Sequence, residues 1–135
     1  ETVLPLAGLH LLLAEDNELN SEIATALLEE QGASITAVEN GRLALEAIRN
    51  AAPRTYDAIL MDVMMPEMNG LEATRCIRAF EGKGPGEGTP IIAMTANVFA
   101  DDVKACLDAG MNSHVGKPLD MKVLIGEILK YTNAH

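Results

Sequence analysis

The stretch from Tyr56 to Gly70 constrains the fold most strongly, because four apolar residues, Ala58–Met61, run without interruption into a carboxylate, Asp62. An unbroken apolar run between turn-forming residues is typical of a strand buried on both faces, as in a parallel sheet. Charged side chains are rarely buried without a partner, so Asp62 is expected at the carboxyl end of its strand. Open α/β sheets bind their ligands at that edge.

Further short runs of apolar or alternating residues predict four more strands, each followed by a helical pattern. The predicted strands are Leu9–Ala14, Ser34–Val38, Pro90–Met94 and a short one around Ser113–Val115. Ser34–Val38 alternates in polarity, so we expect it nearer an edge of the sheet. Strand and helix thus alternate five times, which favours a doubly wound α/β fold with a parallel sheet and helices on both of its faces.

Apolar residues at helical spacing predict the side of each helix that packs on the sheet. In chain order they are Leu19, Ile23, Ala26 and Leu27; Leu45 and Ile48; Ala73, Ile77 and Phe80 of a helix from about Gly70 to Phe80; Phe99, Val103 and Leu107; and Met121, Leu124, Ile125 and Ile128. A chain of 135 residues is long enough for one domain with a real core. We expect a linker over residues 1–8, one domain over residues 9–132 and a tail over residues 133–135.

The charge and the cysteines exclude several classes of function. A formal net charge of -10 repels a nucleic-acid backbone, so no nucleic-acid partner is expected. No apolar run approaches the roughly 20 residues that a membrane helix needs, so we expect no membrane contact by this domain. Cys76 and Cys106 form no metal-binding or disulfide pattern, which fits a reduced cytoplasmic compartment.

Polar residues follow four of the predicted strands: Glu15 with Asp16, then Asp62, Thr95 and Lys117. In a parallel sheet they would share one crevice, where three carboxylates repel one another unless they share a cation. A ligand set made only of oxygen atoms favours Mg²⁺, and a hydroxyl and an ammonium group beside it match phosphoryl transfer. Taken singly, the acids could instead start a helix, Thr95 could be a cap and Lys117 a surface lysine.

The motifs around these residues make the sequence resemble a receiver domain of two-component signalling from about Leu9 to Tyr131. They are Leu13–Asn17, Met61–Gly70, Ala93–Ala96 and Gly116–Pro118. The resemblance implies a flavodoxin-like fold with five helices and strand order 2-1-3-4-5.

The resemblance also implies a role for each residue of the crevice. Asp62 would accept a phosphoryl group from a phosphohistidine. Asp16, Asp62 and the backbone carbonyl of Met64 would bind Mg²⁺ directly, and Glu15 would act mostly through a water. Thr95 would hydrogen-bond the phosphoryl group, and Lys117, whose bond to Pro118 is usually cis in the family, would pair with it.

Three further residues take family positions that regulate the phosphorylated state. His114 stands where an aromatic residue usually rotates inward as Thr95 moves, so we expect it to be the switch residue, with an output face from about Val98 to Lys130. Met64 and Asn97 stand at positions that tune hydrolysis of the phosphoryl group. Methionine cannot orient an attacking water as an amide can, so Met64→Asn should change the phosphorylated lifetime.

Details such as Glu15–Asn20 and Met64–Gly70 resemble receivers of hybrid sensor histidine kinases. They imply a cytoplasmic phosphorelay in which a kinase phosphodonor domain supplies Asp62 and a histidine phosphotransfer protein receives from it. The domain would then be a phosphoacceptor with its own phosphorylation and dephosphorylation chemistry, and its parent chain a histidine kinase.

A stand-alone, single-domain response regulator is the alternative to this hybrid-kinase origin. A Mg²⁺-dependent phosphatase with an aspartyl nucleophile is a weaker alternative, because Met64 stands where such enzymes typically have a second acid. A receiver-like adaptor would lack an acid or the lysine, and neither is missing.

Overall fold

The computed structural model describes residues 4–52, 54–84, 86–96 and 100–132. Strands and helices alternate along these residues, five of each. They are β1 (His10–Ala14), α1 (Glu18–Glu30), β2 (Ser34–Val38), α2 (Gly41–Asn50), β3 (Ala58–Asp62), α3 (Gly70–Glu81), β4 (Ile91–Thr95), α4 (Ala100–Ala109), β5 (Ser113–Gly116) and α5 (Met121–Thr132). Within the described ranges, no helix is long and apolar enough to cross a membrane.

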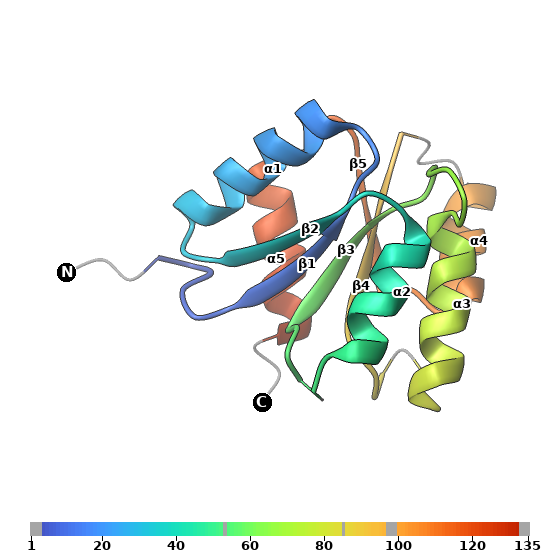
Figure 1. The fold of residues 1–135 in the computed structure, drawn as a ribbon. Helices are drawn as coiled ribbons and strands as arrows, with labels where there is room; N and C mark the ends of the chain where they lie inside the picture. The colour runs from blue at the N-terminus through green and yellow to red at the C-terminus, as the bar shows by residue number, and fades with distance from the viewer. Residues whose placement is uncertain (1–3, 53, 85, 97–99, 133–135) are drawn as a thin grey trace.

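The five strands form one parallel sheet in the order β2-β1-β3-β4-β5. α1 and α5 cover one face, and α2, α3 and α4 cover the other (Figure 1). The predicted doubly wound fold and the implied strand order are both confirmed. Because every strand runs in the same direction, the carboxyl ends of all five lie at one edge.

Two apolar cores lie on opposite faces of the sheet. Leu11 and Leu13 of β1 belong to the core under α1 and α5, whereas Leu12 and Ala14 belong to the core under the other helices. This division follows from the strand period of two, which sends successive side chains to opposite faces. Every residue of β3 and β4 is buried, while β2 is partly exposed, as its alternating sequence predicted for an edge strand.

The predicted buried stripe is wrong for α1, and single residues of it are wrong for α3 and α4. On α1, Leu19 and Ile23 are 64% and 51% exposed, and the core is contacted instead by Ala24 and Leu28. The apolar residues of α1 form two adjacent rows along the helix, one that includes Ile23 and one that includes Ala24 and Leu28. Only the second row packs against β1. Ala26 is likewise exposed, and Leu27 is half-buried.

On α3 the prediction holds for Ala73 and Ile77 and fails only at Phe80, and on α4 it fails at Leu107. Phe80 and Leu107 are both about half exposed, while Ile77 and Cys106 are buried. Phe99 lies outside the described residues. On α2 and α5 the predictions hold, because Ile48, Leu124 and Ile128 are buried. Leu45, Met121 and Ile125 are partly buried against the cores.

The segment expected to be a linker contributes a side chain to the core. Leu6 is fully buried, and its amide donates a 2.9 Å hydrogen bond to the carbonyl of Gln31 at the end of α1. Gly32 has a φ of 102°, and a Cβ there would lie 2.8 Å from the backbone nitrogen of Ala7. The described part of residues 1–8 therefore packs on the α1–β2 turn. The expected tail, residues 133–135, lies outside the described residues.

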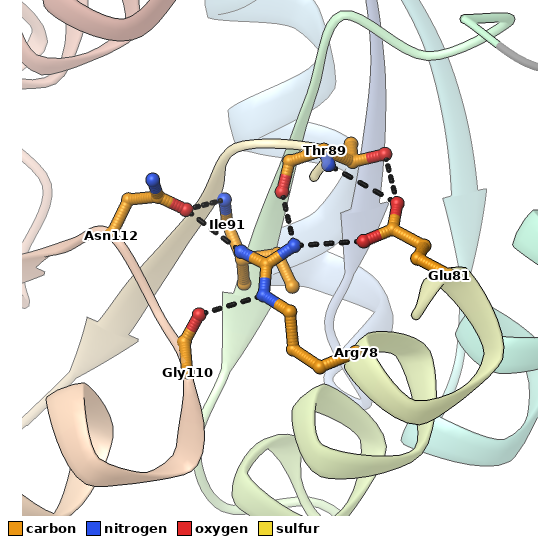
Figure 2. Close-up of polar contacts among 6 residues, drawn as sticks. All are labelled: Arg78, Glu81, Thr89, Ile91, Gly110 and Asn112. Atoms are coloured by element: carbon orange, nitrogen blue, oxygen red, sulfur yellow. Dashed lines mark hydrogen bonds and ion pairs between the residues drawn. The ribbon is translucent and has the colours of Figure 1, made fainter. Parts of the chain in front are cut away.

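A buried arginine joins several elements at the amino end of the sheet (Figure 2). Arg78 of α3 donates hydrogen bonds of 2.9 Å to the Glu81 carboxylate, to the carbonyls of Thr89 and Gly110, and to Oδ1 of Asn112. Burial lowers the pKa of its guanidinium group, and the adjacent Glu81 partly offsets this effect.

Glu81 also accepts hydrogen bonds from the amide and hydroxyl of Thr89. The pair is nearly excluded from solvent, with side chains 9% and 13% exposed. A buried ion pair of this kind stabilises a fold only while both partners and their hydrogen bonds are present. Arg78 therefore anchors α3 to the segments that precede β4 and β5.

Replacing Arg78 with methionine should destabilise the fold strongly. The Arg78→Met variant would leave the Glu81 carboxylate buried without its cation, which typically costs about 3–5 kcal/mol of unfolding free energy. Urea denaturation followed by circular dichroism measures the change. Arg75→Met on the exposed side of the same helix is the matched control and should change stability by about 0.5 kcal/mol or less. Equal losses in the two variants would contradict the anchoring role.

Candidate functional site

The carboxyl edge of the sheet brings together the polar residues singled out in the sequence. Glu15 and Asp16 follow β1, Asp62 and Thr95 end β3 and β4, and Lys117 follows β5. All five line one cleft of about 270 Å³. Among the described residues, the three acids offer carboxylate oxygens that all lie within 4.8 Å of one another. The expected juxtaposition is therefore present.

Asp62 is held in the cleft by the backbone around it. Its side chain is 6% exposed, and its Oδ1 accepts a 3.3 Å hydrogen bond from the amide of Met64. The loop that follows returns closely past the strand, because the amide of Gly70 donates to the carbonyl of Val63. A Cβ on Gly70 would lie 2.3 Å from the carbonyl oxygen of Asp62, so only glycine fits there.

The same loop is fixed at its far end by the start of α3. Asn69 and Glu72 form a capping box, in which each side chain accepts a hydrogen bond from the other residue's amide. Glu67 adopts a positive φ of 64° and accepts hydrogen bonds from the side chains of Asn40 and Arg42. The turn after Asp62 is thus attached both to α3 and to the start of α2.

Glu15 and Asp16 are adjacent in sequence but differ in surroundings. Glu15 is buried, and one of its oxygens accepts a hydrogen bond from the amide of Asn17. Asp16 is exposed. Asn17 caps α1 by accepting a hydrogen bond from the amide of Asn20, so the chain turns away directly after the acid pair.

Lys117 joins the acids from the other side of the cleft. Its Nζ lies 2.9 Å from Asp62 Oδ2 and 3.1 Å from Glu15 Oε1. Burial alone would lower the pKa of Lys117, but the hydrogen bonds and charges of Asp62 and Glu15 outweigh it and raise the pKa above its ordinary value. Lys117 is therefore an ammonium ion at neutral pH. Its bond to Pro118 is cis, as the resemblance implied.

Thr95 and Lys117 are connected through the backbone. Thr95 ends β4, and its carbonyl accepts a 2.9 Å hydrogen bond from the amide of Lys117. The Thr95 side chain is nearly buried and lines the cleft. A hydroxyl and an ammonium group thus border the same space as the three acids.

The cleft has the chemistry of a divalent cation site. Its described lining places three carboxylates near a single ammonium group, which leaves an excess of negative charge. The donors are oxygen atoms, with no thiolate or imidazole among the clustered ligands, and hard cations such as Mg²⁺ prefer oxygen. The residues present therefore fit the expected ion.

Two of the three positions that were expected to be regulatory lie within the described residues. Met64 lines the cleft and is 77% exposed. His114 is half-buried on β5, where it pairs in register with Ala93, and it is not among the cleft-lining residues. Asn97 lies outside the described residues, as does Val98 at the start of the expected output face.

An apolar groove adjoins the acidic cleft, and the sequence analysis did not predict it. The groove has a volume of about 530 Å³ and shares Glu15, Asn20 and Lys117 with the cleft. Ile23 and Leu27 of α1 line it together with Leu119, which follows β5. Both α1 residues were predicted to face the core. The spacing of Asn20 three residues after the cap Asn17 is the one sequence signal that could have placed this side of α1 near the cleft.

Comparisons with known proteins agree with this geometry. Residues 11–129 match the family model of the response regulator receiver domain. "Probable histidine kinase 1" of Oryza sativa subsp. indica is 41% identical over 83% of this chain, which spans only 14% of that relative's length.

Two solved structures share the fold and illustrate what related domains bind. The receiver domain of sensor histidine kinase PA1611 from Pseudomonas aeruginosa was solved with magnesium in its active site cleft. It has a TM-score of 0.81 and 38% identity, with 95% of this chain and 100% of that chain covered. The receiver domain of Ssk1 from Saccharomyces cerevisiae was solved with the histidine phosphotransfer protein Ypd1. Its match has a TM-score of 0.83 and 26% identity, with 93% of this chain and 89% of that chain covered.

Removing one acid should stabilise the ion-free protein. In the Asp16→Asn variant the repulsion among the three carboxylates falls, so the free energy of unfolding in a chelator should rise by about 0.5 kcal/mol or more. Addition of Mg²⁺ should then stabilise the native chain more than the variant, because the variant lacks one ligand. Glu22→Gln, at an exposed position of α1 away from the acid cluster, is the control. A less stable Asp16→Asn variant in chelator would contradict the repulsion.

Proposed function

The chain belongs to the response regulator receiver domain family, and from this we propose that Asp62 accepts a phosphoryl group from a phosphohistidine. The convergence of Glu15, Asp16, Asp62 and Lys117 in one cleft is the observation that carries the proposal. In the transfer, an Asp62 carboxylate oxygen forms a bond to phosphorus as the bond between phosphorus and the histidine nitrogen breaks. The product is an aspartyl phosphate.

The residues around Asp62 have distinct roles in this transfer. Asp16, Asp62 and the backbone carbonyl of Met64 would hold Mg²⁺, with Glu15 acting through a water. The ion, when bound, offsets negative charge on the phosphoryl oxygens. The Lys117 ammonium and the Thr95 hydroxyl donate hydrogen bonds to those oxygens. Lys117 already contacts Asp62, so little rearrangement is needed to place its positive charge beside the transferred group.

The parent protein is proposed to be a hybrid sensor histidine kinase acting in a phosphorelay. The similarity to a plant histidine kinase and to a bacterial kinase receiver supports this origin. Both cysteines are free thiols, which fits the cytoplasmic location that we propose for the domain. A stand-alone response regulator would use the same cleft. An aspartyl phosphatase is disfavoured, because the residue two positions after Asp62 is the thioether Met64 rather than an acid.

Asp62→Asn should abolish phosphorylation. The native chain should gain one phosphoryl group in intact-mass measurements after incubation with acetyl phosphate and Mg²⁺, and the variant should gain none because its amide is a poor nucleophile. Asp108→Asn, at an exposed position on α4, is the control and should be phosphorylated like the native chain. Equal labelling of Asp62→Asn and the native chain would overturn the assignment of the acceptor.

We further propose that the apolar groove docks a histidine phosphotransfer protein. Such a partner must bring its phosphohistidine within bonding distance of Asp62, so its contact surface has to border the cleft. The groove shares Glu15 and Lys117 with the cleft, and the exposed side chains of Leu19 and Ile23 extend an apolar surface along α1. The Ssk1 receiver, which has the same fold, has been solved with a phosphotransfer protein of this class.

Introducing a charge into the groove should slow transfer from a protein donor. In Ile23→Glu, a carboxylate would be buried when the partner docks, so transfer from phosphorylated Ypd1, used as the probe, should slow by about tenfold or more. Labelling by acetyl phosphate, which needs no docking surface, serves as the reference reaction. Val123→Glu on exposed α5 is the matched control. Equal slowing of the two reactions, or slowing by Val123→Glu alone, would contradict this docking surface.

We propose that His114 is the switch residue that transmits phosphorylation of Asp62 to the output face. The described part of that face begins at residue 100. Its half-buried position on β5, in register with Ala93, places it beside β4, which carries Thr95. Leu107 and Val123 are exposed on α4 and α5, so this face has apolar surface for a partner.

Truncating His114 should uncouple phosphorylation from binding at the output face. His114→Ala should still be labelled by acetyl phosphate, whereas the difference in partner affinity between phosphorylated and unphosphorylated chain should shrink. Titration of each form with the downstream partner measures that difference. An unchanged difference would rule out His114 as the switch.

A further inference from the structure

Met64 differs from the other six methionines of the chain in its exposure. The residue is 77% exposed. Met61, Met94 and Met111 are at most 1% exposed, and Met65, Met68 and Met121 are partly buried against the apolar cores. All seven methionines lie within the described residues. A large apolar side chain that is so fully in water makes no packing contribution of its own.

The backbone of Met64 is nevertheless part of the functional site. Its amide donates a hydrogen bond to Asp62 Oδ1, and the residue lines the acidic cleft. The residue is therefore attached next to the proposed phosphoacceptor while most of its surface remains open to solvent. A chemical change at this sulfur would alter the cleft without disturbing either core.

We propose that Met64 is a site of reversible oxidation by peroxides, which converts its thioether to a sulfoxide at the rim of the acidic cleft. The sulfur lone pair attacks one oxygen of hydrogen peroxide, so that a sulfur–oxygen bond forms as the oxygen–oxygen bond breaks. The departing hydroxide takes the proton of the transferred oxygen and leaves as water. Sulfur is oxidised by two electrons and the peroxide is reduced, and methionine sulfoxide reductases reverse the change.

Exposure makes this oxidation selective. Peroxide must reach the sulfur along a line open to solvent, and the packing that surrounds the other methionines obstructs that approach. Met65 and Met68 lie in the same loop and share its local chemistry, but both pack against the core under α2 and α3. These two residues therefore provide an internal comparison for the effect of burial.

The sulfoxide would bind a water beside Asp62 more strongly than the thioether does. The consequence of this change rests on the proposed function. A thioether is a weak hydrogen-bond acceptor, so Met64 does little to hold a water beside Asp62. The sulfoxide oxygen carries a large negative partial charge and accepts hydrogen bonds strongly. Placed two residues after Asp62, it would orient a water for attack on the phosphoryl group. Oxidation is therefore expected to shorten the lifetime of the phosphorylated state.

Peptide mapping after peroxide treatment tests the site itself. The native chain is exposed to a limited amount of hydrogen peroxide, digested and analysed by mass spectrometry. The first oxygen atom should appear on Met64, well before Met65, Met68 or Met121. Oxidation of any of those three before Met64, or at the same rate, would overturn the proposal. The result does not depend on whether the chain accepts a phosphoryl group.

Decay of the phosphorylated chain tests the consequence. Oxidised native chain should lose its phosphoryl group several-fold faster than untreated chain, and treatment with methionine sulfoxide reductase should restore the slow decay. In Met64→Leu, peroxide should leave the decay rate where it was before treatment. Met64→Gln places an uncharged acceptor at the same position and should decay faster than Met64→Leu without any oxidant.

The outcomes separate the inference from the proposed function. Equal decay of oxidised and untreated native chain would overturn the regulatory consequence, as would an equal effect of peroxide on Met64→Leu. Failure of the native chain to gain a phosphoryl group would contradict the proposed function instead, and the oxidation map would still decide whether Met64 is the modified residue.

Discussion

Charge at the carboxyl edge of the sheet is the constraint on which the rest of the structure depends. Glu15, Asp16 and Asp62 place carboxylate oxygens within 4.8 Å of one another, and in the described lining only Lys117 offers a compensating positive charge. Its contacts with Glu15 and Asp62 join the segment after β5 to β1 and β3. The remaining negative charge suits a divalent cation, and we expect it to make the ion-free protein less stable than its core alone would allow.

At the opposite end of the sheet, buried charges are paired with each other and serve only to stabilise the fold. Arg78 and Glu81 are paired, and every hydrogen bond that Arg78 makes there goes to an oxygen of the protein itself. That network is closed and leaves no excess charge for a ligand. One end of the sheet thus fixes the loops before β4 and β5, and the other gathers Thr95 and Lys117 beside the acids.

The surroundings of the cleft suggest how its chemistry is connected to other molecules. An apolar groove along α1 shares residues with the cleft, so a protein that docks in the groove lies beside Asp62. On the loop after β3, Met64 contacts Asp62 through its backbone amide, and its side chain is exposed enough to be modified. Docking, transfer and modification would then all act within a few residues of a single carboxylate.

The sequence by itself determined the order of elements, the burial of the central strands and the residues of the cleft. This was possible because apolar runs and strand-end acids such as Asp62 depend only on local periodicity and on the common direction of parallel strands. Only the tertiary structure decided which apolar stripe of α1 meets the sheet, because its residues satisfy two neighbouring stripes and the choice depends on contacts with distant β1. The exposed Ile23, the buried Leu6 and the Arg78 network all depend on such long-range packing, which no local pattern records.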